Sequence, residues 1–221
     1  QKSDEKAMQN LSRFMADVFA SRESLAGILD NREERLAWIR DPELRTETAW
    51  GLTRELISRD GVDRALPAAR ELIDAGYASG RYRVWAPRAD AVAKALLAEH
   101  QYSPAYGYLK TAVEGYEKEG MAEPLVRALQ TMSSIDQMLN RNEEANVLLQ
   151  RAVDAAAHLG TDALPVRSRL MAAQGRLARA TGRIPESRAY FKKALALCPQ
   201  PDKTTGDLAL ASISMGEAML E

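Results

Sequence analysis

The chain of 221 residues has little of what most catalytic and metal sites are made from, with one cysteine, two histidines and 6% aromatic residues. The single cysteine, Cys198, excludes an internal disulfide framework and a cysteine-based zinc finger. Two histidines, His100 and His158, are too few for a histidine-rich metal site. An excess of one charge is also missing, because 30 Lys and Arg residues face 31 Asp and Glu residues. Proteins that grip a nucleic-acid backbone are normally basic, so the sequence predicts no nucleic-acid partner.

Long hydrophobic runs and catalytic motifs are missing as well. No stretch approaches the roughly 18 unbroken apolar residues that cross a bilayer, so no membrane span is predicted. The sequence contains no HExxH, no Walker-type phosphate loop, no GxGxxG after a strand and no GxSxG. Acidic pairs such as Glu33-Glu34 and Glu143-Glu144 stand near predicted helix starts, where negative charge opposes the helix dipole. The sequence therefore predicts a non-enzyme without cofactor or metal.

Helical periodicity dominates what is present. Apolar residues make up 46% of the chain, enough to bury a core. One set falls at i, i+3, i+4, i+7 and i+8, which is the spacing of one helix side: Ala49, Leu52, Thr53, Leu56 and Ile57. The breaks between such segments are short and contain turn residues, as at Asp60-Gly61 and Thr181-Gly182. Short loops place consecutive helices antiparallel, so we expect an all-α fold built from αα-hairpins.

The clearest hairpin has small residues at fixed spacing. Its key positions are Gly175, Gly182, Ser187, Phe191, Ala194 and Pro199. A small residue midway along the first helix lets the second helix approach, and Gly182 is suited to the turn. Proline cannot continue a helix, so Pro199 ends the unit. This pattern resembles the tetratricopeptide repeat, and the resemblance is specific over residues 168–201.

Weaker copies of the same pattern lie upstream. They turn at Asn140, at His100-Gln101 and at Asp60-Gly61, with Ala145, Ala105 and Ala65 at the crossing position. Unit starts then fall near 46, 86, 126 and 168, in steps of 40, 40 and 42. The resemblance implies a right-handed superhelix of αα-hairpins, similar to the tetratricopeptide-like solenoids with long repeats. Another αα-solenoid, such as a HEAT-like array, remains open.

The domain division follows from these unit starts. Residues 1–45 are expected to form an N-terminal helical cap or a degenerate repeat, and residues 46–207 four hairpins. Residues 208–221 are expected to be a capping helix or the first helix of a truncated fifth repeat. The chain starts at Gln1 without an initiator methionine, as a processed product or a piece of a longer protein would. The compartment stays open, with the cytoplasm slightly favoured over export.

The resemblance also implies where a partner would bind. In such solenoids the first helix of each unit lines a concave groove. The corresponding positions are Glu47, Trp50, Arg54, Asp90, Lys94, Arg127, Gln130, Ser134, Gln137, Arg169, Arg176 and Arg179. Six of these are cations and two are anions. Arg176 and Arg179 stand one helical turn apart and Arg169 two turns earlier, so the three are expected to form one basic strip.

A groove with this bias suits an acidic or carboxylate-bearing segment, because guanidinium groups bind carboxylates with two hydrogen bonds. The competing interpretation is that these arginines are ordinary solvated charges that cover apolar surface with their stems. Trp50 could anchor a partner, or it could pack beside Trp38. Tetratricopeptide proteins that clamp the carboxylate of a chaperone tail use Lys and Asn at set positions of this face. Those positions hold Trp50, Arg54, Ala91, Arg127 and Thr131 here, so that role is not predicted.

The leading functional hypothesis is a non-catalytic protein-interaction scaffold that binds a peptide or partner domain in a basic-leaning groove. The alternative is an effector-sensing or regulatory segment of a larger bacterial signalling ATPase or transcription regulator, a setting in which long-repeat solenoids occur. An enzyme with an active site dispersed between helices is the third and least favoured interpretation.

Overall fold

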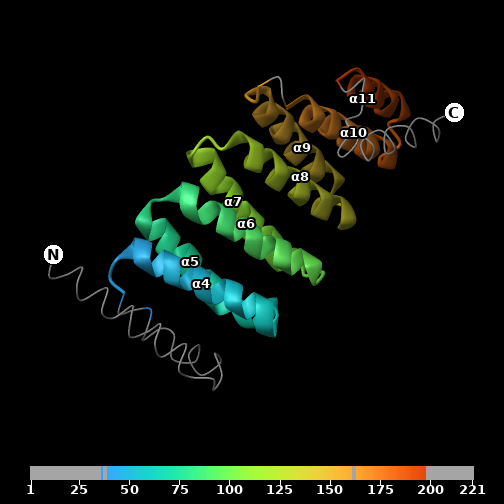
Figure 1. Cartoon of the computed structure of the whole chain (residues 1–221). Coiled ribbons are helices and arrows are strands. Elements are labelled where there is room, and N and C mark those ends of the chain that lie inside the picture. The colour runs from blue at the N-terminus through green and yellow to red at the C-terminus, as the bar shows by residue number, and fades with distance from the viewer. Residues whose placement is uncertain (1–35, 37–38, 161–162, 198–221) are drawn as a thin grey trace. The chain divides into compact units, whose positions relative to one another are not determined.

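A computed structural model describes residue 36, residues 39–160 and residues 163–197. Every regular element in these ranges is an α-helix (Figure 1). The helices are α4 (Pro42–Asp60), α5 (Val62–Ser79), α6 (Tyr82–Ala98), α7 (Tyr102–Lys118), α8 (Ala122–Met138), α9 (Asn142–Ala157), α10 (Leu164–Ala180) and α11 (Ile184–Leu197). Residues 1–35, 37 and 38 of the expected N-terminal cap lie outside the described residues, as do Cys198, Pro199 and the segment 208–221.

Consecutive helices pair into four hairpins, α4–α5, α6–α7, α8–α9 and α10–α11, which pack more extensively within each pair than between pairs. The first helices begin at Pro42, Tyr82, Ala122 and Leu164, so the steps along the chain are 40, 40 and 42 residues. The predicted all-α fold of paired helices is confirmed. The division into domains stays a prediction, since both of its ends lie outside these ranges.

Each hairpin crosses at small buried residues. Ala65, Ala105, Ala145 and Ser187 stand at equivalent places in the second helices and are fully buried. In the last hairpin the Ser187 hydroxyl donates to the Gly175 carbonyl at 2.7 Å. A Cβ at Gly175 would lie 3.0 Å from the Phe191 ring, closer than ordinary van der Waals contact. The small residues therefore let the paired helices pack closely, as the sequence pattern predicted.

The turns of the last three hairpins share one backbone conformation. His100, Asn140 and Gly182 occupy equivalent positions with φ of 60°, 57° and 75°. The residue that follows each of them donates its backbone N–H to the carbonyl five residues earlier, at 2.8–2.9 Å. This is the bonding of a Schellman helix end, which needs one residue in the left-handed region. Glycine adopts that conformation without strain, whereas histidine and asparagine adopt it at some cost.

The chain divides into two compact units, residues 1–119 and residues 120–221. Unit 1 contains α4 to α7. Among the described residues of this unit, the largest buried side chain is that of Trp85 in α6, which is fully buried between α5 and α7. A Cβ at Gly76 would lie 2.6 Å from the Trp85 ring, and a Cβ at Gly115 would lie 2.6 Å from the Cβ of Ala86. Gly76 therefore provides the space that lets α5 of the first hairpin pack against α6 of the second, and Gly115 lets α6 and α7 pack closely within the second hairpin.

Unit 2 contains α8 to α11, and in each of its hairpins a serine hydroxyl of the first helix bonds to the second helix. The Ser133 hydroxyl of α8 donates to the Ala145 carbonyl of α9 at 3.0 Å. The Ser168 hydroxyl of α10 donates to the Ala194 carbonyl of α11 at 2.9 Å. No described helix in either unit is both long and apolar enough to cross a membrane.

Candidate partner-binding face

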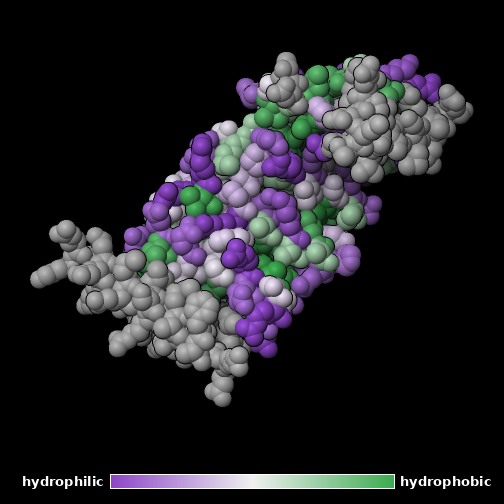
Figure 2. Space-filling view, in the orientation of Figure 1, coloured by the Kyte–Doolittle hydropathy of each residue, from purple (hydrophilic) through white to green (hydrophobic). Residues whose placement is uncertain are grey.

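The predicted groove residues lie on the first helix of each hairpin, on α4 and α6 in unit 1 and on α8 and α10 in unit 2. We call their side of these helices the first-helix face. Its members are Glu47, Trp50, Arg54, Asp90 and Lys94 in unit 1, and Arg127, Gln130, Ser134, Gln137, Arg169, Arg176 and Arg179 in unit 2. All except Asp90 are exposed or half-buried. Hydrophilic and hydrophobic residues alternate in small areas on the side of the surface in view (Figure 2).

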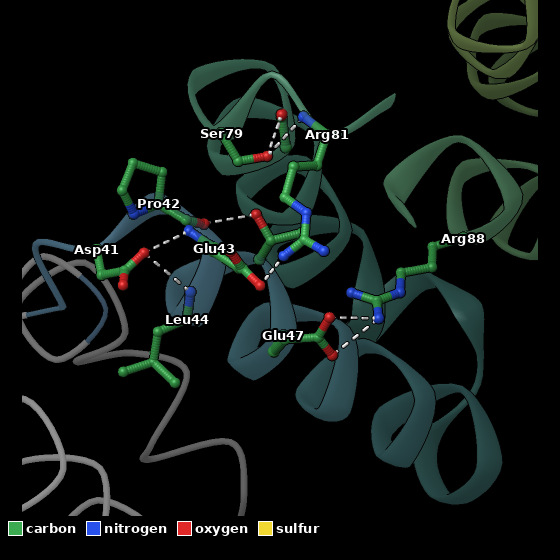
Figure 3. Close-up of polar contacts among 10 residues, drawn as sticks. Asp41, Pro42, Glu43, Leu44, Glu47, Ser79, Arg81 and Arg88 are labelled. Carbon is green, nitrogen blue, oxygen red and sulfur yellow. Dashed lines mark hydrogen bonds and ion pairs between the residues drawn. The ribbon is translucent and has the colours of Figure 1, made fainter. Parts of the chain in front are cut away.

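In unit 1 the start of α4 is fixed by an N-cap. A side-chain oxygen of Asp41 accepts a hydrogen bond from the backbone N–H of Glu43 at 2.8 Å (Figure 3). One turn later, both carboxylate oxygens of Glu47 accept from the Arg88 guanidinium of α6, at 2.6 and 2.8 Å. The guanidinium carbon of Arg88 also lies 5.9 Å from the centre of the Trp50 ring. Arg88 therefore links α4 to α6 across the face.

Arg88 was not among the residues predicted for this face. A signal was present, because Arg88 follows Glu47 by 41 residues, one more than the repeat period. Residues separated by about one period occupy neighbouring places on consecutive hairpins. A search for opposite charges at that separation would have found the pair.

Trp50 is half-buried and packs against a core cluster of unit 1. That cluster consists of Val62, Ala69, Val92, Leu96 and Ala105. Part of the indole therefore belongs to the core, and the remainder is accessible beside Arg88. A cation over an indole ring is favourable by about 0.5–1 kcal/mol at an exposed site.

Two of the six predicted cations are neutralised by a carboxylate one turn earlier on the same helix. Lys94 pairs with Asp90 at 2.8 Å, and Arg127 pairs with Glu123. On α8 the Ser134 hydroxyl also bonds to its own helix, since it donates to the Gln130 carbonyl at 3.0 Å. Lys94, Arg127 and Ser134 are therefore solvated side chains that bond to their own helices.

On α10 the arrangement differs, because that helix carries four arginines and no carboxylate. Arg167 points away from the strip and donates to carbonyls at the end of α9, including that of Ala156 at 3.1 Å. Arg169, Arg176 and Arg179 share the other side of the helix. The pKa of Arg176 lies below the usual range of arginine, mainly because of partial burial and also because of the positive charge of Arg179.

A cluster of aromatic rings in unit 1 was also not predicted. The rings of Tyr77 and Tyr82 lie 4.7 and 5.5 Å from that of Trp85. The ammonium group of Lys118 lies 4.4 Å from the centre of the Tyr82 ring. Desolvation, followed by a hydrogen bond to Glu114, raises the pKa of Tyr77 to about 12. Because the protein's own lysine already occupies these rings, the cluster stabilises the fold and is not a candidate site.

One cavity of about 290 Å³ lies in unit 2 between α9, α10 and α11. Its lining is mostly apolar and consists of Val153, Ala156, Ala157, Arg167, Leu170, Met171 and Leu197. Its volume is close to the lower end of the range for small-molecule sites. In the part of the chain that the structure describes, no three His, Cys, Asp or Glu side chains gather in a way that could hold a metal ion.

No protein-family model and no curated protein matches the sequence. Several solved structures do match the fold. The crystal structure of a variant of a Podosopora anserina protein with nearly identical TPR-like repeats superposes with a TM-score of 0.57 at 17% identity. The match covers 81% of this chain and 89% of that one. BtubC from P. vanneervenii gives a TM-score of 0.56 at 16% identity, over 92% and 93%. The fold is tetratricopeptide-like.

A third structure with a tetratricopeptide-like match is aspartyl phosphate phosphatase F from Bacillus subtilis, with a TM-score of 0.58 at 17% identity. The match covers 97% of this chain and 55% of that protein, so the chain spans about half of its length. Identities this low establish the tetratricopeptide-like fold alone.

Proposed function

We propose that this chain is a non-catalytic protein-interaction scaffold whose first-helix face binds a peptide or a partner domain. The observation that carries the proposal is the exposed set of charged and polar side chains that recurs on the first helix of consecutive hairpins. The opposite sides of the same helices are buried against their partners. Tetratricopeptide-like architecture supports the proposal, because stacked hairpins provide extended binding surfaces.

The pairing of the carboxylates supports a role without catalysis. Glu47 is held by Arg88, Asp90 by Lys94 and Glu123 by Arg127. A general base needs a carboxylate placed to accept a proton from a substrate. These three groups instead accept hydrogen bonds from cations of the chain itself.

A photo-crosslinking scan tests the proposal. A benzophenone amino acid replaces either Ser134, on the first-helix face of α8, or Gln150, on the exposed side of α9. Each variant is irradiated in an extract of the source organism, and its adducts are identified by mass spectrometry. We expect a discrete, saturable protein adduct from position 134 and none from position 150. Adducts from position 150 alone, or from neither position, would contradict the proposal.

The second candidate function is effector sensing within a larger bacterial signalling ATPase or transcription regulator. The apolar cavity between α9, α10 and α11 favours it, since its volume would hold a small organic molecule. Filling the cavity with Leu170→Trp should then abolish retention of a small ligand in native mass spectrometry. If the protein carries no small ligand and its melting temperature responds to none in a metabolite screen, this candidate fails.

A further inference from the structure

The last described hairpin differs from the other three in charge. Between Leu164 and Leu197 there are eight Lys and Arg residues and one acidic residue. The hairpins α4–α5, α6–α7 and α8–α9 contain five cations and seven anions, five and four, and three and five. Because all four hairpins share one fold, the fold itself does not require this excess of positive charge. The eight cations are Arg167, Arg169, Arg176, Arg179, Arg183, Arg188, Lys192 and Lys193.

The repeats provide an internal control for individual positions. In α6, Lys94 has Asp90 one turn before it as an ion-pair partner at 2.8 Å. In α8, Arg127 has Glu123 one turn before it as an ion-pair partner. Both cations belong to the first-helix face, and each has a neutralising carboxylate on its own helix.

The equivalent cations of α10 have no such carboxylate. Arg176 corresponds to Lys94, and the position that would hold its partner is Ala172. Arg169 corresponds to Arg127, and the position that would hold its partner is Pro165. Within the described ranges, neither Arg169 nor Arg176 forms a hydrogen bond or an ion pair. The carboxylates of Asp90 in α6 and Glu123 in α8 are therefore replaced by uncharged residues at the equivalent positions of α10.

The environment of Arg176 makes an added anion favourable. Partial burial and the positive charge of Arg179 both lower the pKa of Arg176, in that order of size. A carboxylate at this place would offset both effects. It could also form the two parallel hydrogen bonds that a guanidinium group offers.

The spacing indicates what shape of ligand fits. Arg169 and Arg176 are seven residues apart, which is about 10.5 Å along a helix axis. Ala172 lies between them along the helix but is buried in a core cluster with Phe191 and Ala194, so it places no side chain at the surface between the two arginines. In a polyproline II segment, residues three apart lie on one side and are separated by about 9 Å. Two acidic residues at i and i+3 of such a segment would each reach one arginine.

We propose that the first-helix side of α10 is a docking site for a short acidic protein segment, bound in an extended conformation with its carboxylates on Arg169 and Arg176. This docking site presupposes the proposed scaffold function and specifies the class of partner that the scaffold binds. A protein segment is favoured over a nucleic acid because the excess of positive charge is confined to one hairpin. The adjacent hairpin α8–α9 carries more anions than cations and would repel a long phosphate backbone.

Fluorescence anisotropy with a defined probe tests the proposal. The probe is a labelled peptide containing Glu-Pro-Pro-Glu, compared with Gln-Pro-Pro-Gln and with Glu-Glu-Pro-Pro, which keeps the charge but changes the spacing. The full chain is compared with Arg169→Glu/Arg176→Glu and with Lys192→Glu/Lys193→Glu. The second pair makes the same change in charge on exposed residues of α11. Circular dichroism verifies that both variants are folded, and Arg169→Gln/Arg176→Gln replaces the first pair if it is not.

We expect the Glu-Pro-Pro-Glu peptide to bind more tightly than both other peptides, and to lose about tenfold or more in affinity with the arginine pair alone. If Lys192→Glu/Lys193→Glu weakens peptide binding equally, the attraction is a diffuse effect of charge and the proposed site is wrong. Tighter binding of a single-stranded RNA oligonucleotide would assign the surface to nucleic acid instead. If the peptide does not bind but position 134 still cross-links a protein, the docking site is wrong and the scaffold function stands.

Discussion

At the scale of single residues, Tyr77 shows how one side chain joins two repeats. Its hydroxyl, on α5, donates to a carboxylate oxygen of Glu114 on α7 at 2.8 Å. Its ring packs 4.7 Å from that of Trp85 on α6. The hydrogen bond is the largest of the causes that lower the pKa of Glu114. A phenol on one hairpin therefore helps to lower the pKa of a carboxylate on the next.

Replacing Tyr77 with Phe should raise the pKa of Glu114 towards its ordinary value of 4.5, because the hydroxyl no longer stabilises the charged carboxylate. A lowered pKa in the folded state stabilises the protein above pH 4.5, and this contribution is lost as the pH falls through the folded value. The variant should therefore lose less stability on acidification than the wild type. Carboxyl-carbon NMR titration measures the pKa. Tyr102→Phe is the control and should leave the Glu114 pKa unchanged.

At the scale of the helix, α7 contains two glycines in different environments. Gly107 is exposed, and an added Cβ would meet nothing within 4 Å. Gly115 is buried, and an added Cβ would lie 2.6 Å from that of Ala86. Glycine weakens a helix interior by about 0.8–1.0 kcal/mol relative to alanine. A glycine inside a helix is therefore expected where a larger side chain would clash with a neighbouring helix. Only Gly115 has such a packing reason.

The substitution Gly115→Ala should lower the free energy of unfolding by about 1–3 kcal/mol, because the methyl group forces α6 and α7 apart. Gly107→Ala should raise the free energy of unfolding by up to about 1 kcal/mol through helix propensity. Urea unfolding followed by circular dichroism measures both. Similar effects of the two substitutions would contradict the close packing of α6 against α7.

At the scale of the whole molecule, the charge of the chain conceals a local excess. The net charge is −1, while the hairpin from Leu164 to Leu197 carries eight cations and one anion. An overall balance near zero argues against a general polyanion binder. It does not exclude a short basic surface, because electrostatic recognition at physiological salt acts within a screening length of about 8 Å. Charge counted hairpin by hairpin is therefore more informative than the total.

The whole chain should give a far-ultraviolet circular dichroism spectrum dominated by helix, since all regular elements of residues 39–160 and 163–197 are helical. In stacked αα-hairpins the backbone hydrogen bonds lie within the helices, and neighbouring hairpins contact one another through side chains. A substantial strand contribution in the spectrum would contradict the fold.

The sequence by itself determined the all-α fold, the pairing of helices and the period of about 40 residues. Local rules fix these features: apolar spacing defines each helix, small residues such as Ser187 and Gly175 permit the crossing, and left-handed turns occur at His100, Asn140 and Gly182. Each of these signals depends on residues within one hairpin. They could therefore be read before any tertiary structure was known.

Only the tertiary structure decided which charged side chains are paired and which are available. The bond between Glu47 and Arg88 joins two hairpins and depends on how closely they approach. Trp50 is half-buried for the same reason, because residues of later helices form the cluster against it. The sequence named Arg169 and Arg176 together with cations that are already neutralised. The two groups of cations can be distinguished only once the ion pairs of the other hairpins are known, because a cation is available to a partner only where no carboxylate of the chain lies beside it.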